Sequence, residues 1–98
     1  MNYYVYILTI AVERSEYEVH LPAHLDYLQQ LDADEALVLS GPFTDRRGGM
    51  VMIRAESKAA ARAIAEADPL VSSGVDTYEL RHWRLTRGDL QRLALEIG

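Results

Sequence analysis

Six segments of this sequence alternate between two kinds of apolar periodicity, and their order constrains the fold more than any other feature. Residues 3–10, 36–40, 50–54 and 77–85 are short and rich in β-branched and aromatic side chains, which is typical of strands. Two helical patterns lie at 22–31 and 58–67, the second behind Ser57 as a candidate N-cap. The order βαββαβ predicts an α+β domain of the split βαβ type, with both helices on one face of a four-stranded antiparallel sheet.

The C-terminal tail carries a pattern of its own. Thr86, with Asp89 three residues later, is typical of a capped helix start. Leu90, Leu93 and Ala94, together with Ile97, would share one face of a short amphipathic helix. We therefore expect a domain at residues 1–85 and a C-terminal helical extension at residues 86–98.

Length, charge and composition exclude several classes of function. A chain of 98 residues supports one hydrophobic core, and its net charge of −5 comes from dispersed carboxylates that phosphate backbones would repel. We expect no nucleic-acid partner. Cysteine is absent and the three histidines lack zinc-motif spacing, so no metal is expected. With no long apolar run and no secretory pattern at the start, we expect a cytoplasmic protein without a membrane contact.

The strand segments also predict self-association. Tyr4, Tyr6 and Leu8 would point to one face of the first strand, yet Val5 and Ile7 on the other face are apolar as well. A sheet face without helices would then expose a larger apolar patch than monomers usually carry. A second copy of the chain covers such a patch most simply, so we expect a homodimer through sheet faces, or a higher oligomer.

His24 interrupts the only apolar stripe of the first helix. Helical periodicity puts it among Leu21, Leu25, Leu28 and Leu31, so the imidazole should point inward and need a polar partner. The best candidate is Asp68, which follows the second helix at the end where a carboxylate is disfavoured. Pro69 biases Asp68 toward extended backbone and so directs its side chain. In the alternative interpretation, Asp68 only caps a loop and His24 is a satisfied core histidine.

Four short motifs resemble those of the YCII-related (YciI-like) proteins over roughly residues 3 to 84: Pro22-Ala23-His24-Leu25-Asp26-Tyr27-Leu28, Ser40-Gly41-Pro42, Asp68-Pro69-Leu70 with Gly74-Val75, and Trp83. The resemblance implies a ferredoxin-like protomer of the dimeric α/β-barrel type, with His24 and Asp68 meeting in a cleft as an active site. Some relatives are similar to lactone-handling or dehalogenating enzymes, and many have no assigned activity. This sequence departs from the family pattern at Leu70, where phenylalanine is frequent, in lacking a clear arginine before the histidine unless Arg14 serves, and in its longer tail.

The pair predicts acid–base chemistry. If Asp68 binds one ring nitrogen of His24, the tautomer is fixed and the other nitrogen becomes a general base. We expect a small cofactor-independent enzyme acting on a small organic molecule such as a lactone or a halogenated compound. The alternative is a non-catalytic small-ligand-binding or accessory homodimer. The candidate substrate-binding residues are Ser40, Gly41, Pro42, Phe43, Arg46 and Trp83.

Overall fold

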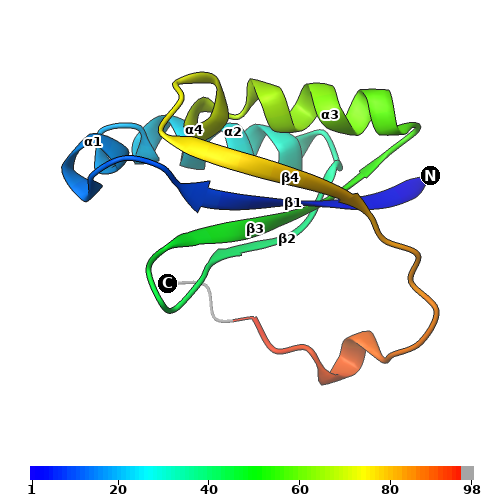
Figure 1. The fold of residues 1–98 in the computed structure, drawn as a ribbon. Helices are drawn as coiled ribbons and strands as arrows, with labels where there is room; N and C mark the ends of the chain where they lie inside the picture. The colour runs from blue at the N-terminus through cyan, green and yellow to red at the C-terminus, as the bar shows by residue number, and fades with distance from the viewer. Residues whose placement is uncertain (96–98) are drawn as a thin grey trace.

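Helices cover one face of a single antiparallel sheet (Figure 1). The computed structural model describes residues 1–95. The strands follow the order β2-β3-β1-β4 across the sheet, and they are β1 (Asn2–Ile10), β2 (Leu37–Pro42), β3 (Gly48–Ala55) and β4 (Asp76–His82). The helices are α1 (Arg14–Glu18), α2 (Leu21–Ala33), α3 (Lys58–Ala67) and α4 (Pro69–Ser72). The predicted α+β architecture with a four-stranded antiparallel sheet is therefore confirmed.

The central strand β1 supplies much of the core. It pairs antiparallel with β3 on one side, where Tyr4 lies opposite Ile53 and Tyr6 opposite Val51, and with β4 on the other. Tyr4, Tyr6 and Leu8 are buried beneath the helices, as the alternation predicted. The functional side chains described below lie where α2 and the α3–α4 junction pack on this strand.

Local signals place the two long helices. Pro22 lies in the first turn of α2, where its missing N–H costs no hydrogen bond. Ser57 accepts a hydrogen bond from the backbone N–H of Ala60 at 3.1 Å, so the predicted N-cap of α3 is confirmed. Within α2, only His24 and Leu31 are buried, whereas Leu25 is exposed although the periodicity placed it on the core face.

Residues 12–20 contain the short helix α1 (Arg14–Glu18), where the sequence predicted a connection or a frayed turn. Helix α1 has one turn and a half, no side-chain cap and mixed charge, so its local signal is weak. Tyr17 is its one buried residue and joins the core cluster. Packing of this aromatic ring therefore stabilises a helix that intrinsic propensity alone does not predict.

The prediction of a C-terminal helix from the amphipathic pattern is wrong for the described residues. Asp89 does cap a turn, because its Oδ1 accepts from the backbone N–H of Gln91 at 2.9 Å. That turn is a single 3-10 turn, η1 (Leu90–Arg92), and Leu93 returns to extended backbone. Leu90 and Leu93 remain exposed, and without a packed apolar face the cost of nucleating a helix is not offset. Ile97 lies outside the described residues.

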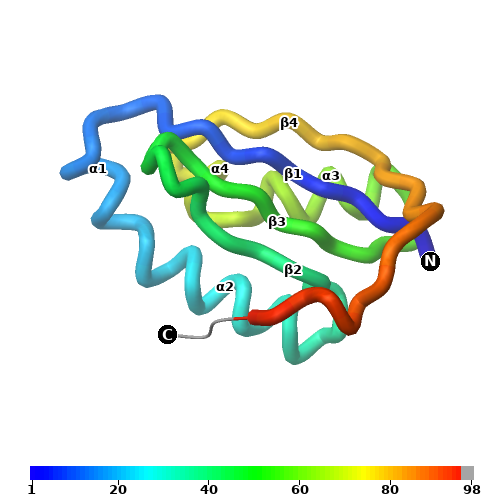
Figure 2. The backbone as a smooth tube through the Cα atoms, turned by 90° about the horizontal axis from the view of Figure 1, so that it is seen from below, coloured from blue at the N-terminus to red at the C-terminus, as the bar shows by residue number. Residues whose placement is uncertain are grey.

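The tail leaves β4 and runs beneath the helix-free face toward the side of β2 and α2 (Figures 1 and 2). In the middle of that face, Val5 and Met52 lie opposite each other in register and are buried. None of the helices in residues 1–95 has the length and apolar character needed to cross a membrane.

Gly48 has the least room for a side chain among the glycines of the described sheet and gives a test of this register. Its φ is +152°, and a Cβ there would lie 1.8 Å from the Leu8 carbonyl oxygen. Gly48→Ala should lower the free energy of unfolding by at least about 2 kcal/mol, measured by urea denaturation. Gly41→Ala is the matched control, because a Cβ there meets nothing within 4 Å. Equal unfolding midpoints for the two variants would contradict the β1–β3 register.

Candidate active site

Asp68 occupies the junction between two helices. It ends α3 with extended backbone, at φ −60° and ψ 127°, and the helix α4 starts at Pro69. Its Oδ1 accepts the backbone N–H of Leu70 at 2.9 Å, so Asp68 is also the N-cap of α4. The sequence placed this carboxylate only at an unfavourable helix end. The structure adds the start of a second short helix, where the backbone N–H of Leu70 donates a hydrogen bond to the carboxylate.

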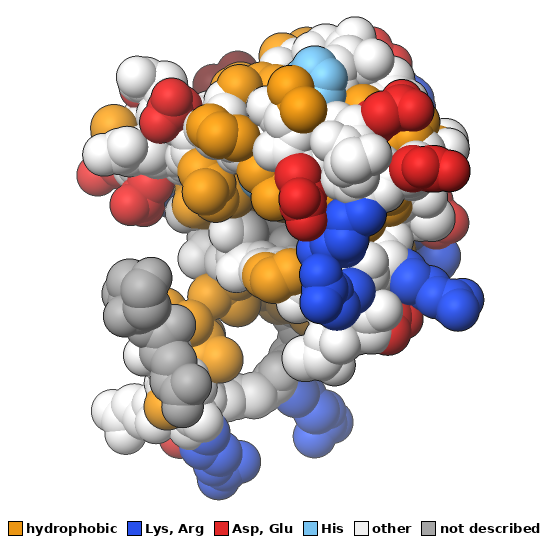
Figure 3. Space-filling model, turned by 90° about the vertical axis from the view of Figure 1, so that its left-hand side faces the viewer, with side chains coloured by type: hydrophobic (Ala, Val, Ile, Leu, Met, Phe, Trp, Pro, Cys, Tyr) orange, Lys and Arg blue, Asp and Glu red, His pale blue; other side chains and the backbone are white. Residues whose placement is uncertain are grey.

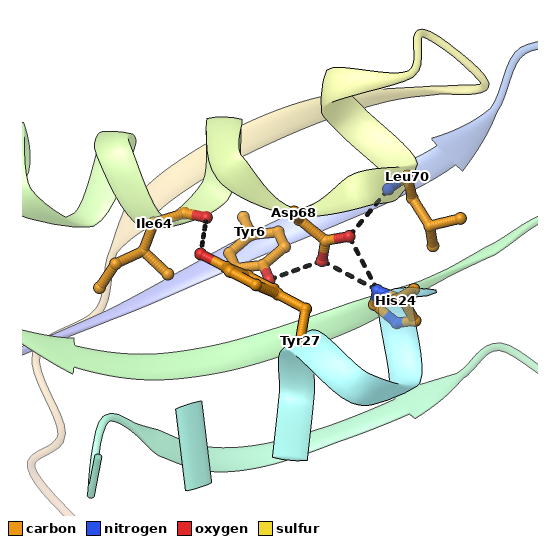
Figure 4. Close-up of polar contacts among 6 residues, drawn as sticks. All are labelled: Tyr6, His24, Tyr27, Ile64, Asp68 and Leu70. Carbon is orange, nitrogen blue, oxygen red and sulfur yellow. Dashed lines mark hydrogen bonds and ion pairs between the residues drawn. The ribbon is translucent and has the colours of Figure 1, made fainter. Parts of the chain in front are cut away.

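The imidazole of His24 reaches this carboxylate from α2 (Figure 4). Its Nδ1 lies 2.8 Å from Oδ1 and 2.9 Å from Oδ2 of Asp68, which is 44 positions further along the chain. His24 is 8% exposed and Asp68 is fully buried. The carboxylate accepts, so Nδ1 carries the proton, and across residues 1–95 the ring uses only this nitrogen for hydrogen bonds. The predicted contact is confirmed, and Nε2 keeps a free lone pair.

Tyr6 gives Asp68 a further donor from beneath. Its hydroxyl donates to Oδ2 at 2.9 Å from the middle of β1 (Figure 4). Burial, followed by the nearby Asp68 charge, raises the pKa of Tyr6 far above its ordinary value, so the hydroxyl stays a donor. The sequence pattern placed Tyr6 only on one face of the first strand and gave its hydroxyl no partner. The available signal was its position, since a tyrosine on the core face of a central strand needs a partner for its hydroxyl.

Tyr27 fixes the helix that carries His24. One turn after His24 on α2, its hydroxyl donates to the backbone carbonyl of Ile64 on α3 at 2.7 Å (Figure 4). This bond joins α2 to α3 close to the junction that holds Asp68. The separation between His24 and Asp68 is therefore set by packing and hydrogen bonds on both helices.

A cleft of about 600 Å³ opens beside His24, between α2 and the strands β2 and β3. From the side of α1, hydrophobic side chains gather around a hollow between the body of the domain and the C-terminal segment (Figure 3). The residues that line the cleft are Leu8, Tyr17, Leu21, His24, Leu25, Leu28, Asp32, Leu37, Val38, Leu39, Ser40, Gly41, Pro42, Gly48, Gly49, Met50, Val51, Leu70, Asp76 and Leu95. Leu25 is exposed because its side chain borders this cleft.

Three of the six predicted substrate-binding residues share this cleft with His24, namely Ser40, Gly41 and Pro42. The structure places the other three elsewhere. Phe43 and Arg46 lie in the exposed turn between β2 and β3, where Arg46 has a φ of +67° and its carbonyl accepts from Arg14. Trp83 follows β4, and β4 is the sheet edge opposite to β2. Sequence adjacency to a lining strand did not bring these side chains into the cleft.

The floor of the cleft holds a carboxyl group that sequence reasoning missed. Asp76 is 4% exposed, and neither of its oxygens has a hydrogen-bond partner within the described part of the chain. Burial, with a contribution from Asp68, raises the pKa of Asp76 to about 6. A signal existed, because β4 begins at Asp76 and alternation puts this residue on the core-facing side with Tyr78 and Leu80. The predicted strand began one residue later.

The site has no arrangement of metal ligands among residues 1–95, where no group of three or more His, Asp and Glu side chains converges. What the described side chains offer is a tautomer-fixed imidazole next to open space, with a second, unpaired carboxyl group in the same cleft. Such an arrangement is able to take up and release protons.

Comparison with known proteins agrees with this architecture. The model of the YCII-related domain family matches residues 1–84. The uncharacterized protein YjpA of Bacillus subtilis (strain 168) is 38% identical over 85 residues, which cover 86% of this chain and 99% of YjpA. The 5-chloro-2-hydroxyhydroquinone dehydrochlorinase TftG of Burkholderia phenoliruptrix AC1100, solved in complex with 2,5-dihydroxybenzoquinone, superposes with a TM-score of 0.67 at 21% identity, over 84% of this chain and 93% of TftG.

The fold is thus a ferredoxin-like α+β fold with a four-stranded antiparallel sheet. The chain belongs to the YCII-related domain family.

The Tyr6 hydroxyl offers a direct test of the hydrogen bonds around Asp68. Tyr6→Phe removes a donor to a buried carboxylate and should lower the free energy of unfolding by about 2 kcal/mol. Tyr27→Phe removes a donor to a neutral carbonyl at a half-buried position and should cost about 1 kcal/mol. Urea denaturation at pH 7 measures both. A loss for Tyr6→Phe no larger than that for Tyr27→Phe would contradict the charged character of the Asp68 contact.

Proposed function

We propose that this protein is a small cytoplasmic enzyme that uses His24 as a general base, with Asp68 as its orienting partner. The supporting observation is the contact of Asp68 with Nδ1, which leaves Nε2 without a partner among the described residues on a ring that lines the cleft. In this tautomer Nε2 accepts a proton from a substrate, and the carboxylate stabilises the imidazolium that forms. Asp68 does not need to move, because Tyr6 and the Leu70 N–H hold it in place.

Proton abstraction next to a carbonyl group fits this arrangement best. The cleft has room for a small ring compound and is bordered mainly by apolar side chains, including Leu21, Leu28 and Val51. Ser40 lines the cleft as well, but no hydrogen bond joins it to His24 in the described structure. A nucleophilic serine is therefore not part of the proposal.

The substrate class is a small cyclic hydroxy-carbonyl compound or lactone, with dehalogenation as one possible outcome. This class is supported by the fold shared with TftG, whose name specifies a chlorinated hydroxyhydroquinone as its substrate. Such molecules carry acidic protons close to carbonyl or hydroxyl oxygens, so one well-placed base starts the reaction.

Turnover of a substrate panel tests the proposal. The panel contains chlorinated hydroxyhydroquinones, followed by chloride release, and unsaturated lactones, followed by ultraviolet absorbance. His24→Gln should reduce kcat/KM about 10²- to 10⁴-fold on any compound that is turned over, because the base is lost. Asp68→Asn should reduce it at least about tenfold, because the amide no longer selects the same tautomer.

His20→Gln is the matched control, since His20 precedes α2 and its side chain makes no cap hydrogen bond. It should leave turnover unchanged. Parental activity in His24→Gln would reject His24 as the base, and an inert response of the parent to both compound classes would reject the substrate assignment.

A non-catalytic ligand-binding or accessory role is the second candidate. It is favoured by the completeness of the contacts around Asp68, since a fully satisfied buried pair also serves simply to hold the cleft in shape. In this case His24→Leu lowers the free energy of unfolding, because Asp68 loses one of its donors, but it leaves binding of the panel compounds intact while the variant is folded. An enzyme loses turnover in the same variant under conditions in which the variant is still folded.

The chain is also proposed to act as a homodimer through its sheet faces. Apolar side chains remain exposed along the segment that follows β4 on the helix-free side, among them Trp83, Leu85 and Leu90. A second copy would cover them together with the half-buried apolar residues of that face. Sedimentation velocity at micromolar concentration should give twice the 11.1 kDa chain mass. A stable single-chain species would contradict the dimer.

A further inference from the structure

Asp76 is an exception among the buried polar groups of this protein. Asp68 and the Tyr6 hydroxyl both have partners, whereas the two oxygens of Asp76 have none within residues 1–95. A buried carboxylate without a donor is costly, so such groups are rare unless they serve a ligand. Asp76 lines the same cleft as His24, and the two side chains share neither a hydrogen bond nor an ion pair in the described structure. Both residues therefore border the cleft in which a small molecule would lie.

We propose that Asp76 is a proton donor, and that it donates to an oxygen of the small molecule whose proton His24 removes. The ligand class is a hydroxy-carbonyl compound such as an enol, a phenol or a hydroxyquinone, which carries an acidic hydrogen and an oxygen acceptor a few bonds apart. This inference rests on the proposed function and adds to it the group that supplies the second proton.

His24 and Asp76 together would catalyse a tautomerisation, with His24 as the base and Asp76 as the acid. Nε2 of His24 accepts the hydrogen of the ligand, and the electron pair of that bond moves through the conjugated chain to the carbonyl oxygen. Asp76 donates its proton there and becomes a carboxylate, while His24 becomes an imidazolium. The ligand leaves as its tautomer with the same atoms and electrons, and solvent returns the proton from the imidazolium to Asp76.

The surroundings of Asp76 favour the neutral acid. Burial has the largest effect on its pKa, and the negative charge of Asp68 from the α3–α4 junction acts in the same direction. His24 on α2 acts oppositely when it is protonated. Tyr17 on α1 faces the group too, and its own pKa is raised by burial and by Asp76, so it stays neutral. On the neighbouring strand, Ile10 lies opposite Asp76 and brings no charge.

The pH dependence of the free energy of unfolding tests the protonation of Asp76 without any ligand. Burial raises the pKa of the Asp76 carboxyl from its ordinary value of 3.8 to about 6, so the folded state holds the proton more tightly than the unfolded chain. The contribution of Asp76 to the free energy of unfolding is therefore complete below about pH 4 and is lost as the pH rises to about 6. Asp76→Asn should abolish this fall and raise the urea midpoint at pH 8 above that of the parent.

Asp26→Asn is the matched control, because it makes the same change on the exposed side of α2. It should reproduce the pH profile of the parent. A lower midpoint for Asp76→Asn than for the parent at pH 8 would overturn the proposal, because Asp76 would then be a charged group that stabilises the fold.

Binding of 2,5-dihydroxybenzoquinone tests the donor role. The ratio of its affinities at pH 5.5 and pH 8 should be about tenfold larger for the parent than for Asp76→Val, because only the protonated carboxyl donates. The ionisation of the probe itself is common to both proteins and cancels in the comparison. Asp76→Asn keeps a neutral donor at every pH, so it should bind at pH 8 at least as well as the parent and lack the extra pH dependence.

The outcomes separate this inference from the proposed function. Equal affinity ratios in the parent and Asp76→Val would overturn the role of Asp76, and absence of binding to the parent at pH 5.5 would overturn the ligand class. The role of His24 is decided separately, by the turnover of His24→Gln. If that variant is inactive while the Asp76 variants behave as the parent, the acid–base enzyme stands with His24 as its base and the proton donor is another group.

Discussion

The arrangement of this domain depends on the hydrogen bonds that the Asp68 carboxylate accepts. It accepts hydrogen bonds from Tyr6 on β1, from His24 on α2 and from the backbone of Leu70 at the start of α4. A fully buried charge without such donors would cost several kcal/mol, so the three elements must meet at this point for the fold to be stable. The same contacts orient the imidazole, and the core and the candidate site therefore share one set of hydrogen bonds.

Two buried carboxyl groups in this small protein have opposite environments. Asp68 has three donors and acts only as an acceptor, while Asp76 has no donor in the described structure and burial favours its protonated form. Environments that separate two carboxyl groups in this way assign them different roles in acid–base chemistry. His24 lines the cleft together with Asp76 and contacts Asp68 through Nδ1, so one imidazole adjoins the carboxylate that has donors and shares a cleft with the carboxyl group that has none in the described structure.

The sequence predictions succeeded where the signal is local or repeats along an element. The strand and helix order, the Ser57 cap and the core face of β1 follow from periodicity and capping chemistry. The His24–Asp68 contact was also predictable, because a histidine inside an apolar stripe requires a polar partner. The predictions for α1 and for the tail were wrong in opposite directions. Tyr17 packs into the core and stabilises a short helix that the sequence did not predict, whereas Leu90 and Leu93 stay exposed and the predicted helix does not form.

By itself, the sequence determined the α+β architecture and the presence of a buried imidazole that needs an acid, because both arise from side-chain patterns within single elements. Only the tertiary structure decided which polar atoms lack partners, and so distinguished Asp76 from the other carboxyl groups. It also decided the lining of the cleft, which includes Ser40 and excludes Phe43 and Trp83. The physical reason is that the space between α2 and the edge strand β2 depends on how whole elements pack, and no spacing along the chain records that distance.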